Sequence, residues 1–170
     1  TFSKLIKQGH DVHVVYQTSG NIAVTDDEAL KFAEVCNDFI GGKKDLEINF
    51  QEVINFINNK KENEVDSPEV RKLKGLIRRR ESLAATRYIG LKDENTHFLD
   101  LPFYETGRIK KNPLGDEDIA IVKDIIEKIK PHQVFAAGDL ADPHGTHEVC
   151  LNAILAAMTS FKQEPYMKDC

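Results

Sequence analysis

Short apolar runs that alternate with helical patterns are the feature that most constrains this fold. Runs at 11–16, 96–102 and 132–138 are largely apolar and do not follow the helical period. Strands that are apolar throughout are typical of parallel sheets, which helices cover on both faces. The alternation therefore predicts an α/β fold of three Rossmann-like layers, in which helices flank a mostly parallel sheet.

Helical patterns with recognisable ends account for most of the remaining chain. Helices are predicted at 1–9, 26–40, 46–58, 67–90, 116–129 and 146–160. Thr25 and Glu28 form a capping-box pattern, and Ser67 followed by Pro68 is typical of a helix start. The segments 59–66 and 104–115 are predicted to be surface loops, and the second is expected to be mobile. With 170 residues, the chain is expected to form a single domain over 1–170.

The composition argues against several classes of partner. The 23 Lys and Arg residues are outnumbered by 28 Asp and Glu residues, and a net charge of −5 argues against a nucleic-acid binder. The three cysteines form no CxxC pair, which favours a reducing compartment. No apolar run approaches the ~18 residues of a membrane span. We therefore expect a cytoplasmic protein that binds neither nucleic acid nor membrane.

The segments that follow the three predicted strands are candidates for a binding site. In open parallel sheets, ligands bind beyond the carboxyl ends of the strands. The segments 18–21, 102–107 and 138–147 are therefore predicted to share one rim of the sheet. At the first of these, the hydroxyl of Thr18 and the turn residue Gly20 suit contacts with a sugar or a phosphate.

Two histidines three positions apart, His144 and His147, stand where the last predicted strand passes into a helix. Neutral imidazole is a common ligand of zinc, and Asp139 and Asp142 lie close by in the sequence. The pattern predicts part of a metal site, and a polar helix cap with solvent-facing histidines is the alternative. The remaining histidines are expected to be structural or to lie at the surface or sheet edge: His10, His13, His97 and His132.

Three consecutive arginines, Arg78, Arg79 and Arg80, lie on the long predicted helix. Consecutive helical residues fan over some 200°, so at least one of them must point toward the sheet or its rim. An arginine at the rim could bind a phosphate or carboxylate with two hydrogen bonds, and Glu81 could hold it in place. A solvated basic helix face is the alternative.

Four stretches of the chain together match the motifs of one enzyme family. They are the strand and turn from Val12 to Gly20, the helix pattern of Arg78, Glu81, Ala85 and Gly90, the LDLP strand, and the DPHxxH motif. In these stretches the chain resembles the PIG-L/LmbE-like zinc-dependent N-deacetylases. The stretch GHDVHVVYQTSGNIAVTDDEALKFAE is more similar to one bacterial subgroup, in which such a domain is fused behind a glucosamine-6-phosphate deaminase module.

The resemblance implies a role for each residue that matches a family motif. His147 matches the third metal ligand, and His144 matches the histidine that assists the tetrahedral intermediate. Arg78 matches the arginine that grips the substrate, and Asp142 would orient or hydrogen-bond within the motif. The implied cofactor is zinc or another divalent metal.

One family motif, an N-terminal HPDD followed by Glu or Asp, does not occur in this sequence. In the family it supplies two further metal ligands and the carboxylate base, and a threonine follows it where this chain begins at Thr1. We therefore expect a domain truncated at both ends that lacks its first, central strand and binds metal weakly or not at all. A homo-oligomer that covers the exposed strand edges is a further expectation.

The resemblance implies a metal-dependent hydrolase that removes the N-acetyl group from an N-acetylglucosamine-type sugar, with or without a phosphate. The fragment itself is expected to be inactive, because half of the site is absent. Two alternatives stay open. One is glucosamine-6-phosphate deaminase activity through the fused module, and the other is a non-catalytic domain that binds phosphosugars.

Overall fold

The computed structural model describes residues 2–41, 49–138, 141, 144–162 and 164. The chain divides into two compact units, Thr1–Phe98 and Leu99–Cys170. It is an α/β protein with a small parallel sheet of two strands flanked by helices, as predicted. The expectation of a single domain over the whole chain stays a prediction.

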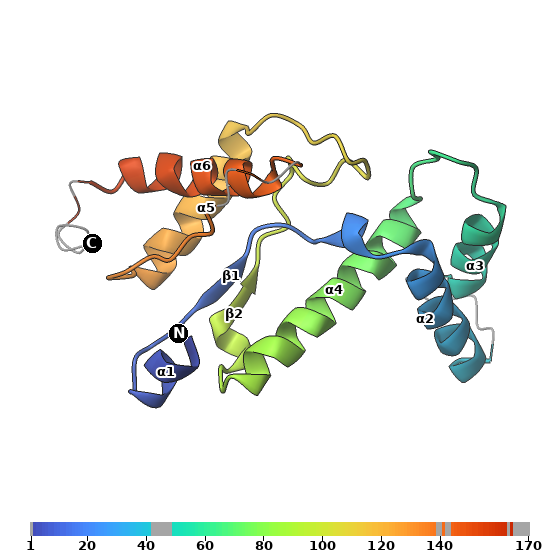
Figure 1. The fold of residues 1–170 in the computed structure, drawn as a ribbon, viewed down its shortest axis with the longest axis horizontal. Coiled ribbons are helices and arrows are strands. Elements are labelled where there is room, and N and C mark those ends of the chain that lie inside the picture. The colour runs from blue at the N-terminus through green and yellow to red at the C-terminus, as the bar shows by residue number, and fades with distance from the viewer. Residues whose placement is uncertain (1, 42–48, 139–140, 142–143, 163, 165–170) are drawn as a thin grey trace. The chain divides into compact units, whose positions relative to one another are not determined.

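The first unit contains the sheet and most of the helices (Figure 1). Its elements in chain order are α1 (Phe2–Lys7), β1 (Val14–Tyr16), the 3-10 turn η1 (Asn21–Ala23), α2 (Asp26–Phe39), α3 (Phe50–Asn59), α4 (Pro68–Tyr88), the 3-10 turn η2 (Asp93–Asn95) and β2 (Thr96–Phe98). Strands β1 and β2 pair in parallel, with Val15 opposite His97.

The helices of the first unit begin where their capping residues predict. The Thr25 hydroxyl accepts a hydrogen bond from the Glu28 amide at 3.2 Å, and the Ser67 hydroxyl accepts one from the Val70 amide at 3.3 Å. Each hydroxyl satisfies an amide that has no partner within its helix. Local signals therefore determine the starts of α2 and α4.

The apolar core of the first unit lies among α2, α3 and α4. Its buried members are Val24, Ala29, Ala33, Val53, Val70, Leu73 and Ile77. The two alanines have no exposed surface, and side chains this small allow a close approach of α2 to its neighbours. The core thus fixes the first half of α4, the helix that carries the arginines.

Helix α4 covers one face of the two-stranded sheet. The Thr96 hydroxyl donates a hydrogen bond of 3.1 Å to the Thr86 hydroxyl, and the Arg79 guanidinium lies 4.7 Å from the centre of the Phe98 ring. Side chains alternate between the faces of a strand, so Val15 points to the opposite face and is 37% exposed. The prediction that the strand at 11–16 is buried on both faces is therefore wrong, because Val15 of β1 is exposed.

The second unit pairs two helices, α5 (Asp116–Ile129) and α6 (Thr146–Thr159). The residues buried in these helices include Val122 and Ile126 of α5, and Ala153 and Ala157 of α6. The segment between β2 and α5 forms turns without a regular element, as predicted for 104–115.

The strand predicted at 132–138 does not form. The structure assigns no strand to residues 133–138, and Phe135 is 55% exposed. A strand is held by hydrogen bonds to a neighbouring strand, and in the part of the chain that the structure describes only β1 and β2 pair in this way. The apolar composition of this segment was therefore not sufficient to make it a strand.

Candidate functional site

The turn after β1 packs against α4 at the arginine that the sequence singles out. Gly20 has a φ of +67°, which favours glycine, and a Cβ placed there would lie 3.3 Å from Nε of Arg78. One helical turn earlier, a Cβ at Gly75 would lie 3.7 Å from Cβ of Ser19. The structure thus brings two of the predicted substrate-binding residues, Gly20 and Arg78, into contact, with Thr18 two residues before that glycine.

The side chain of Arg78 is held in place but stays accessible. Its guanidinium donates a hydrogen bond to the carboxylate of Glu81, and 45% of the Arg78 side chain is exposed. The prediction that Glu81 holds this arginine is confirmed. Its neighbour Arg79 points to the sheet at Phe98, which confirms the predicted fan of directions.

The two histidines of the DPHxxH motif lie at the beginning of α6. His144 precedes the helix, Gly145 turns the chain with a φ of +66°, and His147 lies in the first helical turn. Both imidazoles are exposed. The neighbouring aspartates of the motif, Asp139 and Asp142, lie outside the described residues.

His144 borders an open pocket of about 600 Å³ in the second unit. One wall is formed by residues 109–113 of the loop before α5. The remaining lining residues precede α6 or lie on it, and they are His144, Gly145, Glu148, Val149 and Asn152. The predicted catalytic histidine therefore lines the same pocket as a loop that contains two lysines.

The described residues do not make a complete metal site. A catalytic zinc takes three protein ligands and a water molecule. Within the described ranges, no three His, Cys, Asp or Glu side chains are grouped so that they could hold a metal ion. His147 supplies one imidazole, which is not sufficient for tight binding of a metal.

Asp118 is a functional candidate that the sequence analysis missed. Its carboxylate is buried and accepts hydrogen bonds from the amides of Phe103 and Gly115, both at 2.9 Å. The amide of Asn112 donates a further bond of 3.0 Å to the carbonyl of Phe103. These contacts close the base of the loop that lines the pocket. An aspartate at the third helical position after Gly115 is a sequence signal for the bond with the Gly115 amide. The sequence holds no such signal for the bond with the Phe103 amide.

A pair of histidines was also not predicted. Nδ1 of His13 lies 2.9 Å from Nε2 of His97, and the two rings stack at 5.2 Å. The Asp11 carboxylate lies 3.5 Å from the other nitrogen of His13, and Asn95 donates a hydrogen bond to Asp11. The parallel pairing of two strands brings these residues together, and the sequence alone does not give its register.

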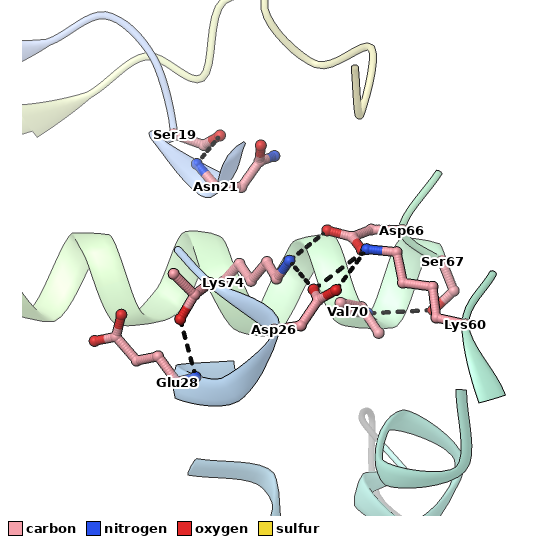
Figure 2. A network of polar contacts seen from close by, with 10 residues as sticks. Ser19, Asn21, Asp26, Glu28, Lys60, Asp66, Ser67, Val70 and Lys74 are labelled. Carbon is pink, nitrogen blue, oxygen red and sulfur yellow. Dashed lines mark hydrogen bonds and ion pairs between the residues drawn. The ribbon is translucent and has the colours of Figure 1, made fainter. Parts of the chain in front are cut away.

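A closed ring of four charges joins α4 to the start of α2 (Figure 2). Lys74 contacts Asp26 at 2.6 Å and Asp66 at 2.7 Å, and Lys60 contacts the same two carboxylates at 2.9 Å and 2.5 Å. Burial raises the pKa of the Asp26 carboxyl, but the hydrogen bonds from Lys74 and Lys60 outweigh this and lower it below its ordinary value. The ring therefore fixes the start of α2 to the helix that carries the arginines.

The comparisons with known proteins agree with these motifs. The family model PIG-L, described as GlcNAc-PI de-N-acetylase, matches residues 1–158. A glucosamine-6-phosphate deaminase-like protein of Bacteroides thetaiotaomicron is 47% identical over 177 aligned positions that include the whole chain. The chain spans 27% of the length of that relative. No solved structure matches the chain, and no described helix is long and apolar enough to cross a membrane.

Proposed function

The chain belongs to the PIG-L family of GlcNAc-PI de-N-acetylases, and on that premise we propose that the protein removes the N-acetyl group from an N-acetylglucosamine-type sugar. The match over residues 1–158 is the observation that carries the proposal, because it includes both histidines and Arg78. The pocket beside His144 supports it, since it offers space for a sugar next to the proposed catalytic side chain.

The reaction is the hydrolysis of an amide bond. Water adds to the acetyl carbonyl, the carbon–nitrogen bond of the tetrahedral intermediate breaks, and the nitrogen takes up a proton to give acetate and a free amine. In our proposal His144 donates a hydrogen bond to the oxyanion of that intermediate. Removal of one such donor commonly lowers the rate by ~10²–10³.

Three residues are proposed to bind the sugar rather than to react. Arg78 would hold the sugar, and its bond to Glu81 orients the guanidinium for that task. Thr18 and Gly20 would add contacts from the turn that packs against Arg78 at Gly20. Asp142 is proposed to orient the histidine motif by a hydrogen bond.

Members of the family are generally metal-dependent, and we propose His147 as one ligand of a divalent metal, zinc in the first instance. A bound divalent metal polarises a carbonyl and lowers the pKa of coordinated water. Among the described residues no three possible ligands are grouped, so we propose that the ligands that join His147 come from outside them.

The location of the protein and its binding partners are also proposed. We expect a cytoplasmic location, an amino sugar as the small-molecule partner, and binding to neither nucleic acid nor membrane. We also propose a homo-oligomer that covers the edges of the two-stranded sheet.

The proposal is tested in the complete protein that carries these residues. Acetate release from N-acetylglucosamine and from its 6-phosphate is measured for the wild type and for His144→Ala, His147→Ala and His132→Ala. His132 is exposed and lies outside the motif, so its variant is the matched control. We expect a loss of ~10²–10³ for His144→Ala, a comparable or larger loss with reduced metal content for His147→Ala, and wild-type rates for the control. Wild-type acetate release and metal content in His147→Ala would refute the assignment.

The name of the Bacteroides relative favours one second candidate, the deamination of glucosamine 6-phosphate. That reaction releases ammonia and leaves the sugar without its nitrogen. If the motif histidines serve it, His144→Ala lowers ammonia release. If a separate part of the protein performs it, the variant releases ammonia at the wild-type rate and loses only acetate release.

A further inference from the structure

The pocket beside His144 has one wall whose side chains suit an anion. We propose that the loop 103–115 and the start of α6 form the subsite for the phosphate of a phosphorylated amino sugar. This inference rests on the proposed function, and it goes beyond it by assigning the substrate class and the residues that select it.

The charges that line the pocket support this choice. The residues that line it include Lys110, Lys111 and Asn112 of the loop and Asn152 of α6. Ammonium and amide groups are hydrogen-bond donors to phosphate oxygens. Glu148 is the acidic residue among those that line the pocket. It lies on α6, so we place the phosphate on the side of the lysines, away from that carboxylate.

The loop is braced, so binding does not have to order it. The Asp118 carboxylate binds the amides at both of its ends, Phe103 and Gly115. Within the loop, the Thr106 hydroxyl accepts a hydrogen bond from the Arg108 amide at 3.1 Å and donates one to the Lys110 carbonyl at 3.0 Å. A loop that is already held in shape loses little conformational entropy when a ligand binds.

Lys111 is the better fixed of the two lysines. Its ammonium lies 3.8 Å from the centre of the Tyr104 ring and donates a hydrogen bond of 2.8 Å to the Arg108 carbonyl. Burial lowers the pKa of this ammonium, and the Glu105 carboxylate only partly offsets that effect. A phosphate close to a partly desolvated cation restores favourable interactions that the cation has lost. Lys110 is exposed, whereas Lys111 contacts the Tyr104 ring. Replacement of Lys110 is therefore the less disruptive test of the subsite.

The experiment measures binding separately from catalysis. The complete protein is titrated by calorimetry with glucosamine 6-phosphate, glucosamine and inorganic phosphate, none of which contains an acetyl group to be removed. The variants are Lys110→Met, Lys110→Met with Lys111→Met, and Lys128→Met, which removes an exposed lysine of α5. Circular dichroism confirms that each variant is folded.

We expect glucosamine 6-phosphate to bind at least ten-fold more tightly than glucosamine. Lys110→Met should weaken the binding of the phosphorylated sugar about ten-fold, as expected for the loss of one charge-assisted contact. The double variant should weaken it further, and Lys128→Met should bind as the wild type does. Binding of glucosamine should not change in any variant. In acetate-release assays with N-acetylglucosamine 6-phosphate, the lysine variants should raise KM and leave kcat within about two-fold.

Three outcomes would overturn the subsite. They are equal affinities for glucosamine and its 6-phosphate, unchanged affinity in the double lysine variant, and binding of inorganic phosphate as tight as that of the sugar phosphate. Each is distinct from a failure of the proposed function. Phosphate-dependent binding without acetate release would retain the subsite and refute the deacetylase function. Acetate release at the same rate from the phosphorylated and the unphosphorylated sugar would retain the deacetylase function and refute the subsite.

Discussion

Replacement of Lys74 by methionine removes one of the two cations from the four-charge ring at the start of α2. The side chain of Lys74 is 5% exposed and contacts the carboxylates of Asp26 and Asp66 at 2.6 Å and 2.7 Å. In the variant, both carboxylates stay beside Lys60 as their remaining partner in the ring, at 2.9 Å and 2.5 Å. Two negative charges then share one positive charge in a partly buried place.

The expected loss of stability follows from these contacts. Removal of one partner from a buried ion pair costs about 3–5 kcal/mol, because it leaves a charge without compensation. Here Lys60 still compensates part of the charge, and methionine fills most of the volume of the lysine stem. We therefore expect the free energy of unfolding to fall by about 3 kcal/mol, which corresponds to a lower Tm by about 6–12 °C for a protein of this size.

The assay is urea unfolding followed by circular dichroism, with thermal unfolding in parallel. Lys31→Met is the matched control, because Lys31 is an exposed lysine of α2, and it should change the free energy by less than about 0.5 kcal/mol. Asp26→Asn in the Lys74→Met background should recover part of the loss, since it removes the excess negative charge. A Lys74→Met variant as stable as the wild type would refute the reasoning, and so would a further loss on adding Asp26→Asn.

Two further predictions concern carboxylates of the two units. The ring holds the pKa of Asp26 below its ordinary value of 3.8, so its contribution to stability is present above that value and is lost as the pH falls through the lower, folded-state pKa. Acid unfolding of the wild type followed below pH 4 should therefore depend more steeply on pH than that of Asp26→Asn, and equal slopes would contradict the assignment. In the second unit, Asp118→Asn leaves either the buried Phe103 amide or the part-buried Gly115 amide without its acceptor, so stability should fall by about 1–3 kcal/mol. Hydrogen exchange at Phe103 or Gly115 should become faster in this variant, and unchanged protection of both amides would show that the loop does not depend on the carboxylate.

The helices were predictable because their signals are local. Thr25 and Ser67 mark the starts of α2 and α4 within the sequence, and the structure places both helices within one or two residues of the predicted bounds. The contact of Arg78 with Glu81 was predictable for the same reason, since residues three apart on a helix are neighbours.

The strands and the polar clusters were less predictable because they depend on contacts between distant residues. The segment 132–138 has a strand-like composition, but it gains that structure only from a paired neighbour. His13 and His97 are separated by 84 positions, and Lys74 and Asp26 by 48. No local pattern gives the register that joins such pairs. The bond between Asp118 and the Phe103 amide depends in the same way on how the intervening loop closes.

The central claim is that the chemistry of these residues is the removal of an acetyl group. The most direct measurement is the product balance when the complete protein acts on N-acetylglucosamine 6-phosphate, with acetate, free amine and ammonia determined in the same sample. We predict one acetate for each free amine, no release of ammonia from the deacetylation step, and loss of acetate in His144→Ala. Ammonia without acetate, or acetate that His144→Ala releases at the wild-type rate, would contradict it.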